Sequence, residues 1–344
     1  MIYSSGARLS RKSSISDTLS QPEIDFAGMR IYNFSILKKG MVRLERKTCR
    51  HAWLIMTHGN FEILEKQIRF LDSENADFFV HVDAEGFSCD HYRNAAEKSA
   101  VSFLPRQKVC WGDMTQIECE LRLLEASISG KYDYYHLLSG TDVPVKTREY
   151  IEQYFSDRRG TNFIKFQSRE INARNLARVR YYYPFQVLNI RGRIGRTLLR
   201  ELGLLPQRIL RIDRTKRFPD IVFQKGTNWF DITGELASYV LSKRDLIREV
   251  FRSTCCADEM FLQTVVVNSP FADSLPGCAF DNDFRACCRY IDWDRGSPYT
   301  FGNGDYEELI HTGPDYLFAR KFDYSAAPDV VDRLFSYFGT EAEP

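Results

Sequence analysis

Two adjacent carboxylates, Asp258 and Glu259, stand at the start of the apolar segment MFLQTVV, where the pattern predicts a helix over Ala257–Val266. Carboxylates in a first helical turn often cap free N–H groups and complement the helix dipole, so a structural role is one interpretation. The other is that one carboxylate points into a cleft and removes a proton from a substrate as a general base.

A basic pair, Arg320 and Lys321, lies between Phe318 and Phe322 near the end of the chain. Such a pair is either a surface ion pair or a clamp on a diphosphate leaving group, because two cations can compensate phosphate charge as a divalent ion does. The second interpretation predicts a reaction in which a diphosphate departs without the help of a metal.

Polar side chains also gather at the ends of predicted strands, namely His58, His81, Asp83 and Asp142. Carboxylates in such places can bind ribose hydroxyls or a metal ion. No Asp-x-Asp lies at these strand ends, and the two that occur, Asp281–Asp283 and Asp292–Asp294, are displaced from the strands. We therefore expect no metal site.

Trp229 and Trp293 are either core residues or aromatic platforms for the face of a sugar. The sequence contains no Gly-rich phosphate loop, no Gly-x-Ser-x-Gly elbow and no His-Glu-x-x-His motif. Dinucleotide-binding, serine-hydrolase and zinc-protease functions are therefore not predicted.

The elements that would position these residues follow from hydrophobic periodicity. A strand at His51–Thr57, a helix at Phe61–Asp72 and a strand at Asp77–Asp83 predict a parallel pair with a right-handed crossover. In open sheets of this kind, ligands bind beyond the carboxyl ends of the strands. Further predicted helices cover Thr115–Ile128, Thr147–Phe155, Glu235–Leu241 and Val330–Tyr337, and further strands cover Tyr132–Leu138, Thr161–Gln167 and Gly226–Ile232.

The chain has 344 residues, a formal net charge of +1 and 44% hydrophobic residues, which is typical of a globular protein. No run approaches the roughly 18 apolar residues of a membrane span. Near-zero net charge argues against nucleic acid as a partner. Nine cysteines occur without a Cys-x-x-Cys spacing, and the polar first residues contain no secretory signal, so reduced thiols and a cytoplasmic location are expected.

Two stretches differ from the rest in charge. Residues 1–50 are predicted to be a disordered or basic arm, so that the ordered domain covers residues 51–340. Residues 191–217 are rich in arginine, with leucines between the cations. They are either a solvated basic helix or a patch for anionic lipid or a phosphate-bearing acceptor, which would place the protein peripherally at a membrane.

Eight segments, in one order along residues 51–337, resemble the core-2/I-branching glycosyltransferase family, which also includes peptide O-xylosyltransferases. They are AWLIMTHGN, FFVHVD, VCWGDMTQIECELRLL, YDYYHLLSGTDVPVKT, GTNWFDIT, ADEMFLQTVVVNSP, YIDWDRGSP and LFARKFD. The resemblance implies an α/β, GT-A-like, Rossmann-type mixed sheet flanked by helices in a single large domain. It also implies sugar transfer from a UDP-sugar to an acceptor hydroxyl, with inversion at the anomeric carbon and without a metal or other cofactor.

The resemblance also assigns roles to residues. Glu259 matches the family's catalytic base, and Arg320 and Lys321 match the basic pair beside the diphosphate. The predicted contacts with uridine are made by His58, His81, Asp83 and Asp142. The predicted contacts with the acceptor are made by Trp293, Trp229, Arg178, Arg180, Glu170 and Asp258.

Two departures from the family pattern bear on the donor sugar. Arg295 is the nearest match to an arginine of the branching enzymes and is the third predicted ligand of the donor diphosphate, and Asn228 stands where xylosyltransferases tend to show an acid. N-acetylglucosamine is the first expectation for the donor and xylose is the alternative. The expected acceptor is a glycan, a lipid-linked molecule or a peptide. A rival of another class is an inactive UDP-sugar-binding or membrane-surface interaction protein.

Overall fold

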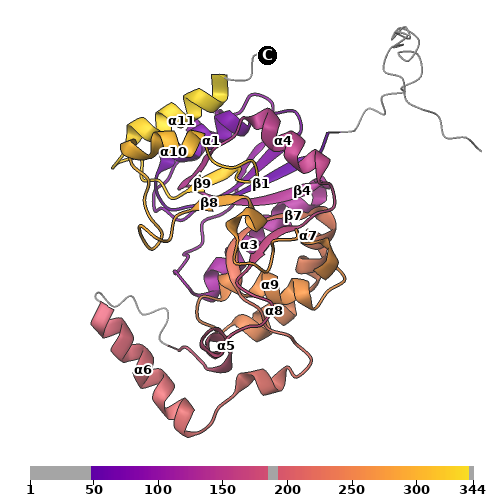
Figure 1. The fold of residues 1–344 in the computed structure, drawn as a ribbon, viewed down its shortest axis with the longest axis vertical. Coiled ribbons are helices and arrows are strands. Elements are labelled where there is room, and N and C mark those ends of the chain that lie inside the picture. The colour runs from indigo at the N-terminus through magenta and orange to yellow at the C-terminus, as the bar shows by residue number, and fades with distance from the viewer. Residues whose placement is uncertain (1–47, 185–192, 341–344) are drawn as a thin grey trace, which may run out of the picture. The chain divides into compact units, whose positions relative to one another are not determined.

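The central sheet contains six strands, which are β1 (His51–Thr57), β2 (Ala76–Val82), β3 (Val101–Phe103), β4 (Tyr134–Ser139), β6 (Phe163–Phe166) and β7 (Gly226–Thr233). Their spatial order is β3-β2-β1-β4-β7-β6 (Figure 1). Strands β3, β2, β1 and β4 are parallel, whereas β7 is antiparallel to both β4 and β6. The computed structural model describes residues 48–184 and 193–340, and the predicted mixed sheet is confirmed there.

The first strand–helix–strand unit has the predicted form. Strand β1 leads through α1 (Phe61–Leu71) into β2, and the two strands pair in parallel from His51↔Ala76 to Thr57↔Val82. Almost every residue of β1 is buried, which is expected of a parallel strand that is covered on both faces.

Helices flank the sheet on both faces (Figure 1). Alternate residues of β1 belong to two apolar clusters, because successive side chains of a strand point to opposite faces. Leu54 packs with α3 and α7 residues on one face, and Trp53 packs with α1 and α4 residues on the other. The remaining helices of the domain are α2 (Asp90–Arg93), α3 (Met114–Ser127), α4 (Arg148–Asp157), α5 (Ala173–Arg180), α6 (Arg193–Ile209), α7 (Gly234–Ser242), α8 (Arg244–Phe251), α9 (Phe261–Val267), α10 (Tyr306–Ile310) and α11 (Pro328–Thr340).

A second sheet of three short strands holds the predicted basic pair. Strand β9 (Phe318–Arg320) lies between β5 (Asp142–Pro144) and β8 (Arg289–Ile291), antiparallel to the former and parallel to the latter. Its residue Ala319 packs with side chains of α11 in a third apolar cluster. This sheet therefore brings the end of the chain back to the segment that follows β4.

A buried polar network joins the two sheets. The Asp231 carboxylate in β7 lies 2.9 Å from His136 Nδ1 and accepts a hydrogen bond of 2.8 Å from Arg289 Nη1 in β8. A second nitrogen of Arg289 donates to the Leu137 carbonyl oxygen at 3.0 Å. All three charged or titratable side chains are fully buried. Removal of one partner from such a network costs about 3–5 kcal/mol of stability, because it leaves a buried charge uncompensated.

Most predicted elements are confirmed within two or three residues, but the predicted helix over Ala257–Val266 is wrong at its start. A separate 3₁₀ turn, η4 (Ala257–Glu259), precedes α9, and Met260 between them has φ −131°. Ala257 and Met260 are both fully buried in the core beside the sheet. Their packing separates the turn from the helix, so Asp258 and Glu259 do not belong to the first turn of α9. The other 3₁₀ turns are η2 (Ile128–Gly130), η3 (Arg214–Arg217), η5 (Ala272–Ser274), η6 (Phe284–Cys287) and η7 (Asn303–Asp305).

Two predictions fall partly on residues that the structure does not describe. Residues 1–47 of the predicted arm and residues 191 and 192 of the predicted basic stretch lie outside the described residues. Within the described ranges, every helix is too short or too polar to cross a membrane.

Candidate active site

Glu259 ends the turn η4, which packs against β7, and its side chain is one-third exposed. Its Oε2 accepts a 2.7 Å hydrogen bond from Arg178 Nη1 in α5 and lies 3.1 Å from Lys225 Nζ. Burial alone would raise the pKa of Glu259, but the charges of Lys225 and Arg178 outweigh it and hold this pKa below its usual value. The carboxylate is therefore ionised at neutral pH, which is the state that can accept a proton.

The pKa of the neighbouring carboxyl group, Asp258, is shifted in the opposite direction. Asp258 is buried, and Gln116 Nε2 donates to its carboxylate over a long distance of 3.4 Å. Burial, and then the charge of Glu259, raises the pKa of Asp258 to about 7. Glu120 in α3 is fully buried, and neither of its carboxylate oxygens has a hydrogen-bond partner among residues 48–184 and 193–340. Burial, and then the charge of Asp258, raises the pKa of Glu120 well above its usual value. The pKa values of the two adjacent carboxyl groups in the predicted acidic pair are thus shifted in opposite directions.

We expect the Asp258→Asn variant to be more stable than the wild type above pH 7, by up to about 4 kcal/mol. The folded protein keeps a proton on Asp258 up to about pH 7, whereas the unfolded chain loses it near pH 4. Wild-type stability therefore falls as the pH rises through this window, and the amide removes that fall. Urea unfolding at several pH values measures the effect, with Asp245→Asn on exposed α8 as the control. A variant that is less stable than the wild type at pH 8 would contradict the assignment.

The predicted basic pair begins at Arg320, which pairs with Asp142 across the β5–β9 ladder. The guanidinium lies 3.1 Å from the Asp142 carboxylate and stacks 3.7 Å above the ring of Trp229 in β7. The other carboxylate oxygen of Asp142 accepts hydrogen bonds from the backbone and hydroxyl of Ser139. Asp142 is fully buried and Trp229 is nearly so. In this structure both residues hold Arg320 in place, and their predicted contacts with uridine and acceptor stay predictions.

Lys321 is half-buried and directly follows Arg320. Its backbone N–H donates to the Tyr299 carbonyl oxygen at 3.4 Å, and its own carbonyl oxygen accepts a 2.9 Å bond from Phe301. Among the described residues, no carboxylate forms an ion pair with its ammonium group. The pair thus combines a guanidinium that is fixed by Asp142 with a cation that pairs with no carboxylate in the described part of the chain.

Strand β7 connects the carboxylate to the basic pair. Lys225, whose ammonium group pairs with Glu259, immediately precedes β7. Trp229, on whose ring the Arg320 guanidinium stacks, lies four residues later. An extended segment of that length spans at most about 13 Å. The register against β6 shifts between Phe166↔Gly226 and Ile164↔Phe230, so the backbone is bulged between these positions. Bulges of this kind re-aim side chains and occur often next to active sites. The structure thus brings Glu259 and Arg320, predicted from distant segments, to one short stretch of backbone.

The predicted uridine residues lie at the carboxyl ends of neighbouring strands. His58 follows β1 and is exposed, whereas His81 in β2 is buried. His81 Nε2 accepts a 3.0 Å hydrogen bond from the Gln107 backbone, and burial lowers its pKa. The two carboxylate oxygens of Asp83 accept from Arg106 Nε at 3.0 Å and from the Val109 backbone at 2.8 Å. His81 and Asp83 therefore hold the loop that follows β3.

Trp293 and Arg295 lie together on the loop after β8. The Trp293 side chain is half exposed, as an aromatic platform requires. Arg295 binds three carboxylates, those of Asp292, Asp305 and Glu308, and stacks on Tyr299 at 4.3 Å. Its charge is therefore already compensated within the protein, which weakens its case as a ligand of a diphosphate.

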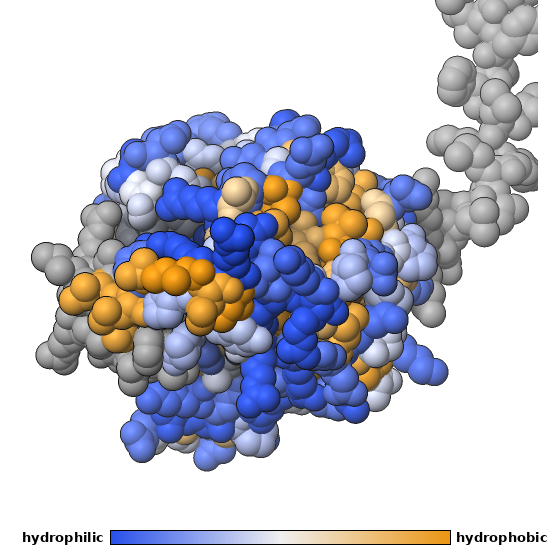
Figure 2. Space-filling model, turned by 90° about the horizontal axis from the view of Figure 1, so that it is seen from below, coloured by the Kyte–Doolittle hydropathy of each residue, from blue (hydrophilic) through white to orange (hydrophobic). Residues whose placement is uncertain are grey.

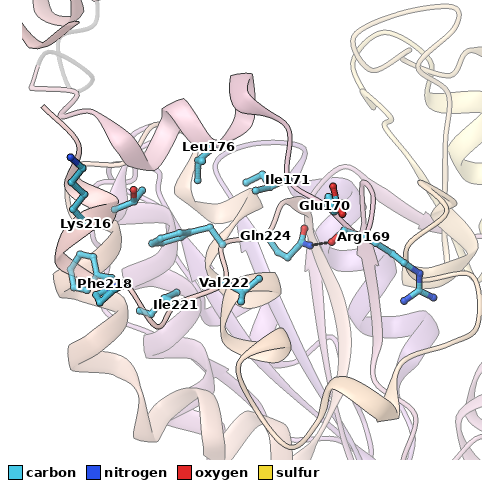
Figure 3. Close-up of a pocket in the computed structure, with 12 residues that line it drawn as sticks. Arg169, Glu170, Ile171, Leu176, Lys216, Phe218, Ile221, Val222 and Gln224 are labelled. Carbon is cyan, nitrogen blue, oxygen red and sulfur yellow. Dashed lines mark hydrogen bonds between the residues drawn. The ribbon is translucent and has the colours of Figure 1, made fainter. Parts of the chain in front are cut away.

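One of the other predicted acceptor residues lines a cavity of about 580 Å³. Figure 3 shows Lys216 at one end of it and Arg169 at the other, with Leu176 and Val222 between them. Glu170 lines this cavity. Glu259 and the basic pair do not line this cavity. Two of its lining residues are nevertheless close in sequence to the cations that bind Glu259. Leu176 is near Arg178, and Gln224 directly precedes Lys225. Arg180 lies elsewhere, 3.3 Å from the Asp213 carboxylate.

Sequence reasoning missed two lysines near the site. Lys225 binds Glu259, and the signal that could have found it is its place immediately before the GTNWFDIT segment. Lys165 in β6 donates to Asn282 and lies 4.2 Å from the centre of the Phe284 ring, and burial lowers its pKa to about 8. Nothing in its sequence context distinguished it.

Side chains that could hold a metal ion do not gather in threes or more anywhere in residues 48–184 and 193–340. Each of the two Asp-x-Asp sequences contains a carboxylate that binds a neighbouring arginine. Asp283 accepts a hydrogen bond from Arg285. Asp292 pairs with Arg295 and also accepts a hydrogen bond from the backbone N–H of Asp294.

Comparison with known proteins identifies relatives of this chain. The family model described as "Core-2/I-Branching enzyme" matches residues 51–309. Xylosyltransferase 2 of Rattus norvegicus is 26% identical over 317 residues, which cover 85% of this chain and 34% of the relative. Xylosyltransferase 2 of Homo sapiens is 25% identical, and Xylosyltransferase 1 of Rattus norvegicus is 24% identical, with similar coverage. The chain spans about a third of the length of these curated relatives.

Proposed function

Because the chain belongs to the Core-2/I-branching enzyme family, we propose that it is an inverting glycosyltransferase that moves a sugar from a UDP-sugar to an acceptor hydroxyl. The observation that carries the proposal is the ionised Glu259 held beside the same short strand segment as Arg320. These two groups are what an in-line displacement requires, a proton acceptor on one side and positive charge on the other.

In the proposed mechanism, Glu259 takes the proton from the acceptor hydroxyl as its oxygen attacks the anomeric carbon of the donor. The bond from that carbon to the diphosphate breaks on the opposite face, and UDP leaves with the bonding electrons. Arg320 and Lys321 stabilise the charge that develops on the departing diphosphate. This mechanism needs no metal.

The donor sugar is open between two candidates. N-acetylglucosamine was the first expectation from the sequence, with xylose as the alternative. The relatives with printed names are xylosyltransferases, which supports xylose, but their identity to this chain is only about 25%. The cytoplasmic location expected from the sequence stays a prediction.

A donor screen tests this proposal. The purified full chain is given UDP-N-acetylglucosamine, UDP-xylose, UDP-glucose or UDP-galactose without an acceptor, and UDP release is measured. We expect release from one of the first two donors, with the same rate in excess EDTA. UDP binding without release from any donor, together with no transfer in an acceptor screen, would favour the inactive binding protein. Loss of activity in EDTA would overturn the metal-free mechanism.

The proposed base has a pH signature. We expect the Lys225→Met variant to shift the acid limb of the kcat/KM profile to higher pH. Lys225 is the largest of the charges that lower the pKa of Glu259, so its removal raises the pKa of the base. A pH series of initial rates measures the shift, and Lys243→Met, at the end of α7 and away from Glu259, is the control. An unchanged limb, or a limb that moves to lower pH, would show that Glu259 is not the titrating base.

A further inference from the structure

Helix α6 carries large apolar side chains on its solvent side. Leucine and isoleucine residues are more than half exposed along it and just after its end, namely Leu198 (61%), Leu202 (59%), Leu205 (55%), Ile209 (72%) and Leu210 (71%). Scattered single apolar residues on a surface need no explanation, but a row of them marks an interaction site.

The spacing of the row places it on one helix face. Leu198, Leu202, Leu205 and Ile209 are separated by four, three and four residues. At about 100° per residue, all four fall within about 60° of one another. The helix thus presents a narrow continuous stripe.

The opposite side of α6 attaches the helix to the domain. Leu204 and Gln207 are buried, and both lie on the far side of the helix from the stripe. The Gln207 side chain hydrogen-bonds the backbone N–H and carbonyl oxygen of Tyr182 at 2.8 and 2.7 Å. The stripe is therefore turned away from the domain.

Cations outnumber acids on α6 and on the segment after it. Figure 2, which looks at the molecule from below Figure 1, shows a band of apolar surface bordered by hydrophilic side chains. The exposed cations of α6 and of the segment after it are Arg200, Arg208, Arg211, Lys216 and Arg217. Glu201 and Asp213 are the acids of the same part of the chain. This excess attracts an anionic surface and repels a second copy of the same helix.

We propose that α6 lies in the plane of an anionic lipid surface, with the leucine stripe in the boundary between headgroups and acyl chains. A helix with an exposed apolar face, an excess of cations and too little length to span the bilayer has this binding mode. The cations contribute attraction to anionic headgroups, and the stripe contributes insertion. The sequence interpretation of residues 191–217 named the cations and the leucines between them, and the structure adds that four of these apolar side chains form one exposed stripe.

This binding mode bears on the acceptor, a consequence that rests on the proposed function. Tyr182, which anchors α6, follows α5, and Arg178 of α5 binds Glu259. A lipid surface under α6 therefore lies on the side of the domain that carries α5 and the proposed base. A lipid-linked acceptor, delivered from that surface, fits this arrangement better than a free glycan does.

Vesicle sedimentation of the full chain tests the proposal without reference to activity. We expect the wild type to sediment with vesicles of phosphatidylcholine and phosphatidylglycerol at low salt, and not with phosphatidylcholine alone. The double variant Leu202→Gln and Leu205→Gln is expected to lose at least tenfold in binding. The matched control is Leu246→Gln, an exposed leucine on α8. Because these side chains are exposed, the thermal unfolding of each variant should match the wild type.

Three outcomes would overturn the proposal. Absence of wild-type binding to anionic vesicles removes it directly. Binding that the stripe variant retains in full would mean that charge alone holds the protein to lipid. A dimer in solution that the stripe variant dissolves, measured by light scattering, would assign the stripe to a second copy of the chain.

Discussion

Replacing Glu259 by glutamine is expected to lower the rate of sugar transfer by a factor of about 10²–10⁴, while the affinity for the UDP-sugar is retained. The amide keeps the size of the side chain but cannot take a proton from the acceptor hydroxyl. The donor is expected to bind through the basic pair, which belongs to β9 and the residue after it, whereas the cations that pair with Glu259 are Arg178 and Lys225. Initial rates measure the first effect, and titration calorimetry with UDP measures the second.

The amide also leaves Arg178 and Lys225 without their carboxylate partner. Thermal unfolding is therefore measured for the same variant, so that loss of folded protein is not mistaken for loss of catalysis. Glu249→Gln is the matched control, because Glu249 is an exposed glutamate whose partner is the surface residue Arg217. Transfer at the wild-type rate by folded Glu259→Gln protein would refute the assignment of the base.

The Lys321→Ala variant is expected to bind UDP more weakly and to turn over more slowly, by about 10²–10³ in rate. The Lys321 ammonium is paired with no carboxylate among the described residues, so its charge remains available to a diphosphate. Arg320 is a poorer target for this test. Its removal would leave the fully buried Asp142 without a counter-charge, and the resulting loss of stability would hide any effect on chemistry.

Binding of UDP and the rate of donor hydrolysis are measured for this variant and for Lys321→Arg, which keeps the charge. The conservative variant is expected to recover most of the activity, because the proposed role is electrostatic. Lys98→Ala, at an exposed lysine remote from β9, controls for the loss of a positive charge. Unchanged UDP affinity in folded Lys321→Ala protein would show that Lys321 does not bind the diphosphate leaving group.

The parts of the fold that could be predicted from the sequence are those with strong local periodicity. The unit from His51 to Val82 was predicted almost residue by residue, because its strands are continuous apolar runs and its helix has one apolar face. The small sheet was not predicted, since β5, β8 and β9 have three residues each and their pairing depends on contacts between remote segments. The break between η4 and α9 was also missed, because the packing of Met260 overrides a locally helical pattern.

For the candidate site, the sequence by itself determined which groups are present, since the acidic pair, the basic pair and the strand-end residues are recognisable by type and by their order along the chain. Only the tertiary structure decided their states. It ionises Glu259 through Arg178 and Lys225, raises the pKa of Asp258 through burial, and fixes Arg320 between Asp142 and Trp229. The physical reason is that charge and desolvation depend on neighbours in space, and these neighbours come from segments far apart in the chain.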